Sequence, residues 1–174
     1  MDKVNFLKKY ELIELTDKDN FILDIKYATK DNFMGNFLIL DSDIFITQDL
    51  LPIFQDIQKN QMIAYDCGYG EDVSINGIRI NQMRDLYSKF SGRYNSKLRY
   101  KGGELIGITS DLIPELLERY SELWKFNYEL YQRKQTKLNE EAHFLSVIYH
   151  HLRFDESLAN KYIKRMWTAV KCDN

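Results

Sequence analysis

The most constraining feature of the chain is a short apolar run, Phe37-Leu-Ile-Leu40, that ends in Asp41-Ser-Asp43. An apolar run of this length between polar residues is typical of a buried strand. Because side chains two positions apart in an extended chain point the same way, we expect Asp41 and Asp43 to lie on one side. Ligands of open α/β sheets bind beyond the carboxyl ends of the strands, where two carboxylates can hold a hard divalent cation that clamps a diphosphate. The alternative is an Asx-rich turn into the next helix, the commoner explanation of a D-x-D tripeptide taken alone.

The length and composition indicate one globular domain. The chain has 174 residues, of which 44% are hydrophobic and 29% are charged, so it can bury a sizeable core. The formal net charge of -2 gives no electrostatic basis for binding nucleic acid. We therefore expect no nucleic-acid partner.

Cysteine usage and hydropathy predict a cytoplasmic protein. Cys67 and Cys172 lie far apart and lack metal-ligand spacing, which favours a reducing compartment over a disulfide framework. The N-terminal residues contain no long apolar core of a signal peptide. No apolar run approaches the roughly 20 residues needed to span a bilayer, so we expect no transmembrane segment.

Apolar periodicity and turn residues predict the elements of the chain. Expected strands cover residues 11–16, 21–27, 37–40, 62–65 and 104–108, with an extended stretch at 44–46. A first helix is expected from an N-cap at Thr47 to about Lys59, and others over 79–90, from Ser110 or Asp111 onward, and over 140–152 with Asn139 as N-cap. Strands and helices alternate from Phe37 onward, which predicts an α/β fold.

Two neighbouring carboxylates, Glu140 and Glu141, open the last of these helices. Carboxylates at a helix N-terminus stabilise the helix by about 0.3–1 kcal/mol each, which explains both without any chemistry. Glu141, however, shares the i, i+4, i+7 line with the apolar residues Leu145 and Ile148. A carboxylate on such a core-facing line can point into a cleft and orient a hydroxyl group or take its proton. Both interpretations stay open.

Two further features have a structural and a ligand-binding interpretation. Gly102-Gly103 before a strand allows a ligand to approach the backbone closely, or makes a tight turn, which is commoner for such a pair alone. The C-terminal residues Lys161, Lys164, Arg165 and Trp167 form a basic, partly aromatic segment. Such a segment can close over phosphates, although a solvated face would have the same composition.

The three histidines do not form a zinc site in the sequence pattern. His143 and His150 are seven positions apart on one helix, roughly 10 Å along its axis, whereas zinc needs imidazole nitrogens within about 2.1 Å of itself. His150 and His151 are adjacent and point about 100° apart. We interpret these histidines as structural or surface residues.

Five stretches of the chain together resemble the GT-A glycosyltransferases, most nearly the glycogenin- and galactosyltransferase-like type. They are Leu38-Ile-Leu-Asp41-Ser-Asp43-Ile with Asp49-Leu-Leu-Pro-Ile-Phe54, then Lys101-Gly-Gly-Glu-Leu-Ile-Gly107, Asn139-Glu-Glu141 and Asn160-Lys-Tyr-Ile-Lys-Arg-Met-Trp-Thr168. The resemblance covers residues 37–174 and implies the C-terminal part of a GT-A-like domain, a mixed sheet flanked by helices.

The resemblance also implies roles for particular residues. Asp41 and Asp43 would hold Mn²⁺ or Mg²⁺ on a UDP- or GDP-linked sugar donor, and the metal would act as a Lewis acid on the leaving group. Glu141, with Glu140 beside it, would be the acceptor-side carboxylate, and Gly102 and Gly103 would lie beside the acceptor, a saccharide or surface glycan. Lys164 or Arg165 would neutralise phosphate charge.

The first 36 residues resemble a different family. Glu11-Leu-Ile-Glu-Leu15 and Leu23-Asp-Ile-Lys-Tyr-Ala-Thr-Lys-Asp-Asn-Phe-Met-Gly35 are similar to the start of bacterial D-alanyl-D-alanine dipeptidases. The zinc and catalytic motifs of that family, S-x-H-x-x-G-x-A-x-D and E-x-x-W-H, do not occur in this sequence. Residues 1–36 are therefore expected to be a short segment rather than a domain.

Three functional hypotheses follow. The first is a metal-dependent glycosyltransferase. The chain is then expected to be a fusion or truncation product that has lost the upstream nucleoside-binding units. One version of this hypothesis expects the enzyme to be inactive because these units are missing. The second is a cell-wall protein related to the dipeptidases but lacking their zinc site. The third is a non-catalytic remnant or interaction domain, for which an aromatic content of 14% would supply an exposed binding face.

Overall fold

A computed structural model describes residues 35–41, 44–93, 96–154 and 156–164. Its centre is a three-stranded sheet in the order β1-β5-β2, formed by β1 (Asn36–Leu40), β5 (Lys101–Thr109) and β2 (Met62–Asp66). Both outer strands run antiparallel to β5 and hence parallel to each other. A hairpin of β3 (Ser74–Ile75) and β4 (Ile78–Arg79) makes a second, smaller sheet.

The predicted α/β class is confirmed at this level, because helices and small antiparallel sheets combine in one structure. Strands were expected over 37–40, 62–65 and 104–108, and β1, β2 and β5 confirm them. The expected mixed sheet is wrong for the described residues, where each pairing is antiparallel because β5 separates the two parallel strands. The stretch at 44–46 lies outside any strand. The expected strands at 11–16 and 21–27, and the dipeptidase-like stretch up to residue 34, lie outside the described residues.

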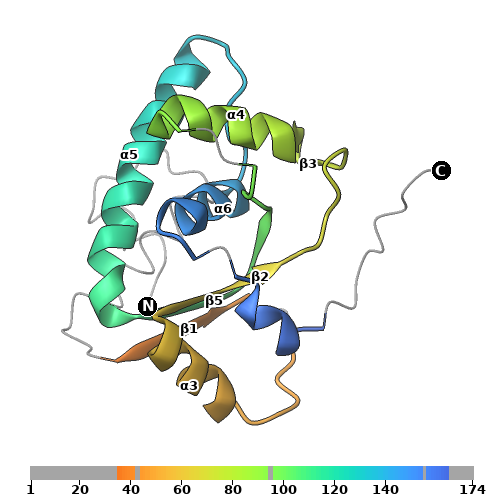
Figure 1. Ribbon diagram of the computed structural model, residues 1–174, viewed down its shortest axis with the longest axis vertical. Coiled ribbons are helices and arrows are strands. Elements are labelled where there is room, and N and C mark those ends of the chain that lie inside the picture. Colours follow the sequence, from red (N-terminus) through yellow and green to blue (C-terminus); the bar gives the residue numbers. More distant parts are fainter. Residues whose placement is uncertain (1–34, 42–43, 94–95, 155, 165–174) are drawn as a thin grey trace, which may run out of the picture.

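Helices cover both faces of the sheet (Figure 1). On one face lies α3 (Leu51–Asn60), and on the other lies α6 (Glu141–His151), itself enclosed by α4 (Ile80–Ser91) and α5 (Ile113–Gln132). The 3₁₀ turn η1 (Ser110–Leu112) leads into α5, and η2 (Leu158–Lys161) lies beside β2. None of the helices in the described part of the chain has the length and apolar character needed to cross a bilayer.

Two helices begin later than the sequence predicts. The first starts at Leu51 rather than after Thr47, because Asp49 Oδ1 accepts the Leu51 N–H at 2.9 Å and Pro52 stands in the first turn. The last starts at Glu141 with Glu140 as its N-cap. Asn139, the expected cap, instead donates from its side chain to the carbonyl of Asn76 at 2.8 Å.

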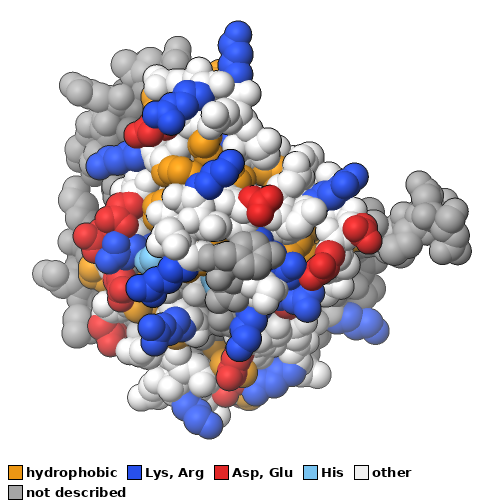
Figure 2. Space-filling model, turned by 45° about the horizontal axis from the view of Figure 1, so that its top comes forward, with side chains coloured by type: hydrophobic (Ala, Val, Ile, Leu, Met, Phe, Trp, Pro, Cys, Tyr) orange, Lys and Arg blue, Asp and Glu red, His pale blue; other side chains and the backbone are white. Residues whose placement is uncertain are grey.

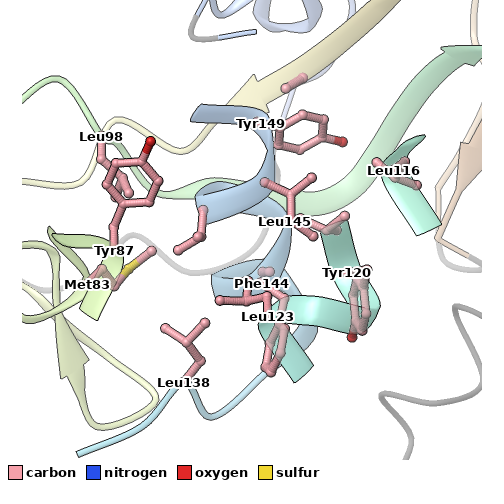
Figure 3. Packing of buried hydrophobic residues seen from close by; sticks show 14 of the residues in the cluster. Met83, Tyr87, Leu98, Leu116, Tyr120, Leu123, Leu138, Phe144, Leu145 and Tyr149 are labelled. Atoms are coloured by element: carbon pink, nitrogen blue, oxygen red, sulfur yellow. The ribbon is translucent and has the colours of Figure 1, made fainter. Parts of the chain in front are cut away.

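Helix α6 is the centre of the larger apolar cluster, which fills the space between the sheet, α4 and α5 (Figure 3). Residues 142–150 of this helix are all buried, which explains why its sequence is apolar on nearly every side. Phe144 stacks on Tyr120 of α5 with ring centroids 5.1 Å apart. His143 and His150 are buried here, which confirms the structural interpretation and contradicts the surface one for these two rings.

The smaller apolar cluster joins α3 to the opposite face of the sheet. Ile57 of α3 and Ile63 of β2 are almost fully buried in it. A Cβ atom at Gly107 of β5 would lie 2.5 Å from Ile63 Cγ1 and 2.6 Å from Ile57 Cγ1. Glycine at this position therefore lets α3 approach the sheet closely and fixes the distance between the two layers.

Candidate functional site

One edge of the sheet gathers most of the residues that the sequence singles out. The parallel strands β1 and β2 end here, and β5 begins here, because Leu40 pairs with Leu105 and Asp66 with Lys101. Asp41 follows β1 directly, is exposed, and donates its backbone N–H to the carbonyl of Glu104 at 3.1 Å. The second carboxylate of the predicted metal pair, Asp43, lies outside the described residues.

A β-bulge shapes this edge. Ala64 of β2 pairs with Ile106, but the next residue, Tyr65, pairs with Gly102, so residues 103–105 of β5 have no counterpart in β2. Bulges interrupt the ladder, bend a strand and occur preferentially near active sites. Gly102 and Gly103 lie inside β5, so the interpretation of this pair as a tight turn is wrong.

The two glycines face different surroundings. A Cβ atom at Gly102 would overlap Glu104 Oε2 and come within 3.0 Å of Cys67 Sγ, so the Glu104 side chain lies across this glycine. A Cβ atom at Gly103 would meet only Glu141 Oε1 within 4 Å, at 3.6 Å. The structure therefore brings the backbone of Gly103 and the carboxylate of Glu141 close together.

Glu140 lies next to Glu141 but in a different environment. Its carboxylate accepts a hydrogen bond from Tyr100 Oη at 2.8 Å and another from the side chain of Asn76. Nε2 of His143 lies 3.4 Å from the same carboxylate. Burial, and after it the charge of Glu140, raises the pKa of Tyr100 above its usual range. Tyr100 is therefore a neutral donor at any physiological pH.

A buried lysine joins β5 to the C-terminal segment, residues 156–164. Lys101 has a side chain only 2% exposed, and its Nζ lies 3.4 Å from Asp66 Oδ2 and 3.2 Å from Ser157 Oγ. Asn160 holds the same point of β2 through its side chain, which accepts from the Asp66 N–H and donates to the Asp66 carbonyl, both at 2.8 Å. These contacts pair the buried ammonium group and join the C-terminal segment to β2 and β5.

The C-terminal segment has a second anchor on α3. Lys161 Nζ lies 2.6 Å from Asp56 Oδ2, and Tyr162 Oη donates to the same oxygen at 2.7 Å. These hydrogen bonds, from Lys161 first and Tyr162 second, hold the pKa of the Asp56 carboxyl below its usual value. Lys161 is thus engaged away from the edge, and Lys164 is exposed at the end of the described segment. Arg165 and Trp167 lie outside the described residues.

Comparisons with protein-family models, curated proteins and solved structures found no match to this chain. Within the described residues, no three histidine, cysteine or acidic side chains lie close enough to hold a metal ion. Of the two predicted metal ligands after β1, Asp41 belongs to the described residues and Asp43 does not.

The sequence pattern missed three residues of this edge. Glu104 and Lys101 flank the glycine pair that was noticed, and Asp66 ends a strand that was expected. A polar residue at the end of a predicted strand is the signal that could have found Asp66. The burial of Lys101 depends on Ser157 and Asp66, which are distant in sequence, so no local pattern could have indicated it.

Charges of both signs are mixed on the face of the molecule that Figure 2 shows. Basic and acidic side chains are interspersed across the face shown in Figure 2, with small groups of hydrophobic side chains between them. Recognition of a charged ligand would therefore depend on a few local groups rather than on a field of one sign.

Proposed function

We propose that the chain is a metal-dependent glycosyltransferase of the GT-A type, acting at the edge where β1 and β2 end. It would transfer a sugar from a UDP- or GDP-linked donor to a saccharide or surface-glycan acceptor. The observation that chiefly supports this is the meeting of Gly103 and Glu141 at the edge that also carries Asp41. The N-terminal 36 residues are not part of the proposed site.

The donor side of the proposed site is the carboxylate pair after β1. Asp41 and Asp43 would hold Mn²⁺ or Mg²⁺ through hard oxygen ligands, and the ion would stabilise charge on the departing nucleoside diphosphate. Lys164 and Arg165 would add positive charge to the diphosphate. The anchoring of residues 156–164 to β2 and α3 supports this part, because it fixes the stretch that precedes Arg165.

The acceptor side is the space between β5 and the start of α6. Glu141 stands at the first position of α6 with its carboxylate 3.6 Å from the point that a Cβ at Gly103 would occupy. In this position it can orient an acceptor hydroxyl or take its proton. Gly103 keeps the backbone of β5 free of a side chain opposite Glu141, whereas the Glu104 side chain lies across Gly102.

A calorimetric titration tests the donor site. We expect UDP or GDP to bind wild type in the presence of Mn²⁺, and binding to weaken at least about tenfold without the metal or in Asp41→Asn, since one metal-ligand charge is lost. Asp85→Asn, at an exposed position of α4, is the matched control and should bind as wild type does. Equal binding by Asp41→Asn and Asp85→Asn would refute the metal role.

A second candidate function is a non-catalytic binding module. Phe45, Ile46 and Leu51 are large apolar residues that are 91%, 59% and 57% exposed just after the D-x-D sequence. Such a group favours a contact surface. A folded protein that binds no nucleotide with Mn²⁺ but does bind a hydrophobic dye, with the dye signal lost in Phe45→Ser, would favour this function instead.

A further inference from the structure

We infer that Glu140 is a positioning residue, which fixes the direction of Glu141 by joining the start of α6 to the start of β5 and to the β3–β4 hairpin. This role rests on the proposed function of Glu141. It gives the two neighbouring glutamates different tasks: Glu141 faces the acceptor space, and Glu140 holds it there. Glu140 is the N-cap, with an extended backbone, and Glu141 is the first helical residue, so the two side chains lie in different surroundings.

The first connection runs to β5. Tyr100 immediately precedes β5, is 7% exposed, and donates its hydroxyl hydrogen to Glu140 Oε1 at 2.8 Å. Gly103 lies three positions further along the chain, and Glu141 Oε1 lies 3.6 Å from the position of its Cβ. One hydrogen bond therefore ties together the two segments that carry Gly103 and Glu141. A shift of either segment would alter the separation of Gly103 and Glu141.

The second connection runs to the hairpin. Asn76 and Gly77 form its turn with positive φ angles of 43° and 84°. The side chain of Asn76 donates to Glu140 Oε2, and its carbonyl accepts from the Asn139 side chain at 2.8 Å. The turn is therefore held by Asn139 and Glu140, the two residues that immediately precede α6.

The third connection is a buried histidine with a defined tautomer. His143 is fully buried, and its Nδ1 accepts the backbone N–H of Asn139 at 3.3 Å. The proton of the neutral ring is consequently on Nε2, which donates to the carbonyl of Ile75 at 3.1 Å and lies 3.4 Å from Glu140. The ring thus braces the hairpin strand β3 against the first turn of α6.

These contacts use both oxygens of the Glu140 carboxylate, whose side chain is 17% exposed. Three side chains surround these oxygens, so the Glu140 carboxylate presents little surface to an acceptor. It is well suited to holding three segments in one geometry, because a site must be fixed to within a fraction of an ångström for efficient chemistry.

The test compares substitutions of Glu140 and of its donor Tyr100 with a matched control. Nucleotide release from UDP-galactose and GDP-mannose with Mn²⁺ is measured over a range of donor concentrations for wild type, Glu140→Ala, Glu140→Gln and Tyr100→Phe. Tyr131→Phe, at a 61% exposed position of α5, is the control. Hydrogen exchange of the first turn of α6 and of the hairpin is recorded for the same proteins.

A positioning role predicts a particular pattern. Glu140→Ala should lower kcat at least about tenfold, leave KM for the donor within about twofold, and speed exchange in the hairpin and the first turn of α6. Glu140→Gln keeps an oxygen that accepts from Tyr100. Its amide N–H can donate to the Asn76 side chain once the Asn76 amide is turned over, so the hairpin also keeps a partner. This variant should therefore recover most of the kcat that Glu140→Ala loses. Tyr100→Phe should fall between the two, and the control should match wild type.

Three outcomes would overturn the inference. One is a wild-type kcat in Glu140→Ala, and another is unchanged exchange in the hairpin. The third is an equal fall of kcat and donor affinity that Glu140→Gln does not recover, which would mean general loss of structure. Tyr100→Phe keeps the test valid if Glu140→Ala fails to fold. Absence of Mn²⁺-dependent nucleotide binding and release in wild type would instead refute the proposed function, and the role of Glu140 with it.

Discussion

At the scale of single residues, the glycines of this chain differ sharply in what surrounds them. Gly107→Ala would place a methyl group 2.5 Å from Ile63 Cγ1 and 2.6 Å from Ile57 Cγ1, in the contact between α3 and the sheet. Overpacking of this kind costs about 1–3 kcal/mol, so we expect the free energy of unfolding to fall by that amount in urea denaturation. Gly70→Ala is the control, since nothing lies within 4 Å of its Cβ position. Equal stability of the two variants would contradict the close packing of α3.

His151 makes stability depend on pH. Burial, and after it the charge of Arg119, holds the pKa of this ring below its usual value, and its Nδ1 is buried with no hydrogen-bond partner among the described residues. The unfolded chain, with a histidine pKa of about 6.5, therefore takes up the proton first as the pH falls. This contribution to stability is complete above about pH 6.5 and is lost progressively below it.

His151→Gln should remove this contribution to the pH dependence. Urea denaturation of both proteins between about pH 7.5 and pH 5 measures it, because only the wild type has a titrating ring at this position. The difference in unfolding free energy between the two pH values should be smaller in the variant. An identical pH dependence would show that His151 has the same pKa in the folded and unfolded chains.

Residue types at the candidate site could be predicted, but their separate environments could not. The local pattern distinguishes Glu141 from Glu140 only by its place on the apolar line with Leu145 and Ile148, and it leaves both interpretations open. Tyr100 and Asn76 separate them in the structure, and both contacts join segments far apart in sequence. Gly103 likewise becomes informative only beside Glu141.

At the scale of elements, apolar runs located the strands better than capping residues located the helix ends. Strands β1 and β2 and helix α4 lie where periodicity predicts them, within a residue or two. The start of α3 was missed because Asp49 rather than Thr47 accepts the first free N–H. Strand β5 extends back to Lys101 through two glycines, since pairing with β2 overrides their weak strand propensity.

The C-terminal segment should depend on one exposed amide side chain. Asn160 bonds both the N–H and the carbonyl of Asp66, so Asn160→Ala removes two contacts that join residues 156–164 to β2. We expect faster backbone hydrogen exchange in this segment and no change in α5 or α6, because opening of a surface segment is local. Asn81→Ala, at an exposed position of α4, is the control. Unchanged exchange in residues 158–164 would show that the other anchors suffice.

At the scale of the whole molecule, strand order creates the candidate site. Two parallel strands, β1 and β2, end at the same edge because α3 connects them and β5 lies between them in the opposite direction. The alternation of strands and helices predicted an α/β fold, but not this order, since pairing is set by contacts between distant segments. The glycosyltransferase function stays a prediction from the sequence motifs and the composition of this edge.

The most direct test is to locate bound Mn²⁺ by its paramagnetic effect on the backbone amide signals of ¹⁵N-labelled protein, in the presence of UDP or GDP. The proposed site predicts that the signals of Asp41, Gly102, Gly103 and Glu141 broaden first, and that Mg²⁺ in place of Mn²⁺ leaves them sharp. It also predicts that the signals at the far end of α5, near Tyr131, persist. Broadening centred elsewhere, or none with a folded protein, would contradict a metal-dependent donor site at this edge of the sheet.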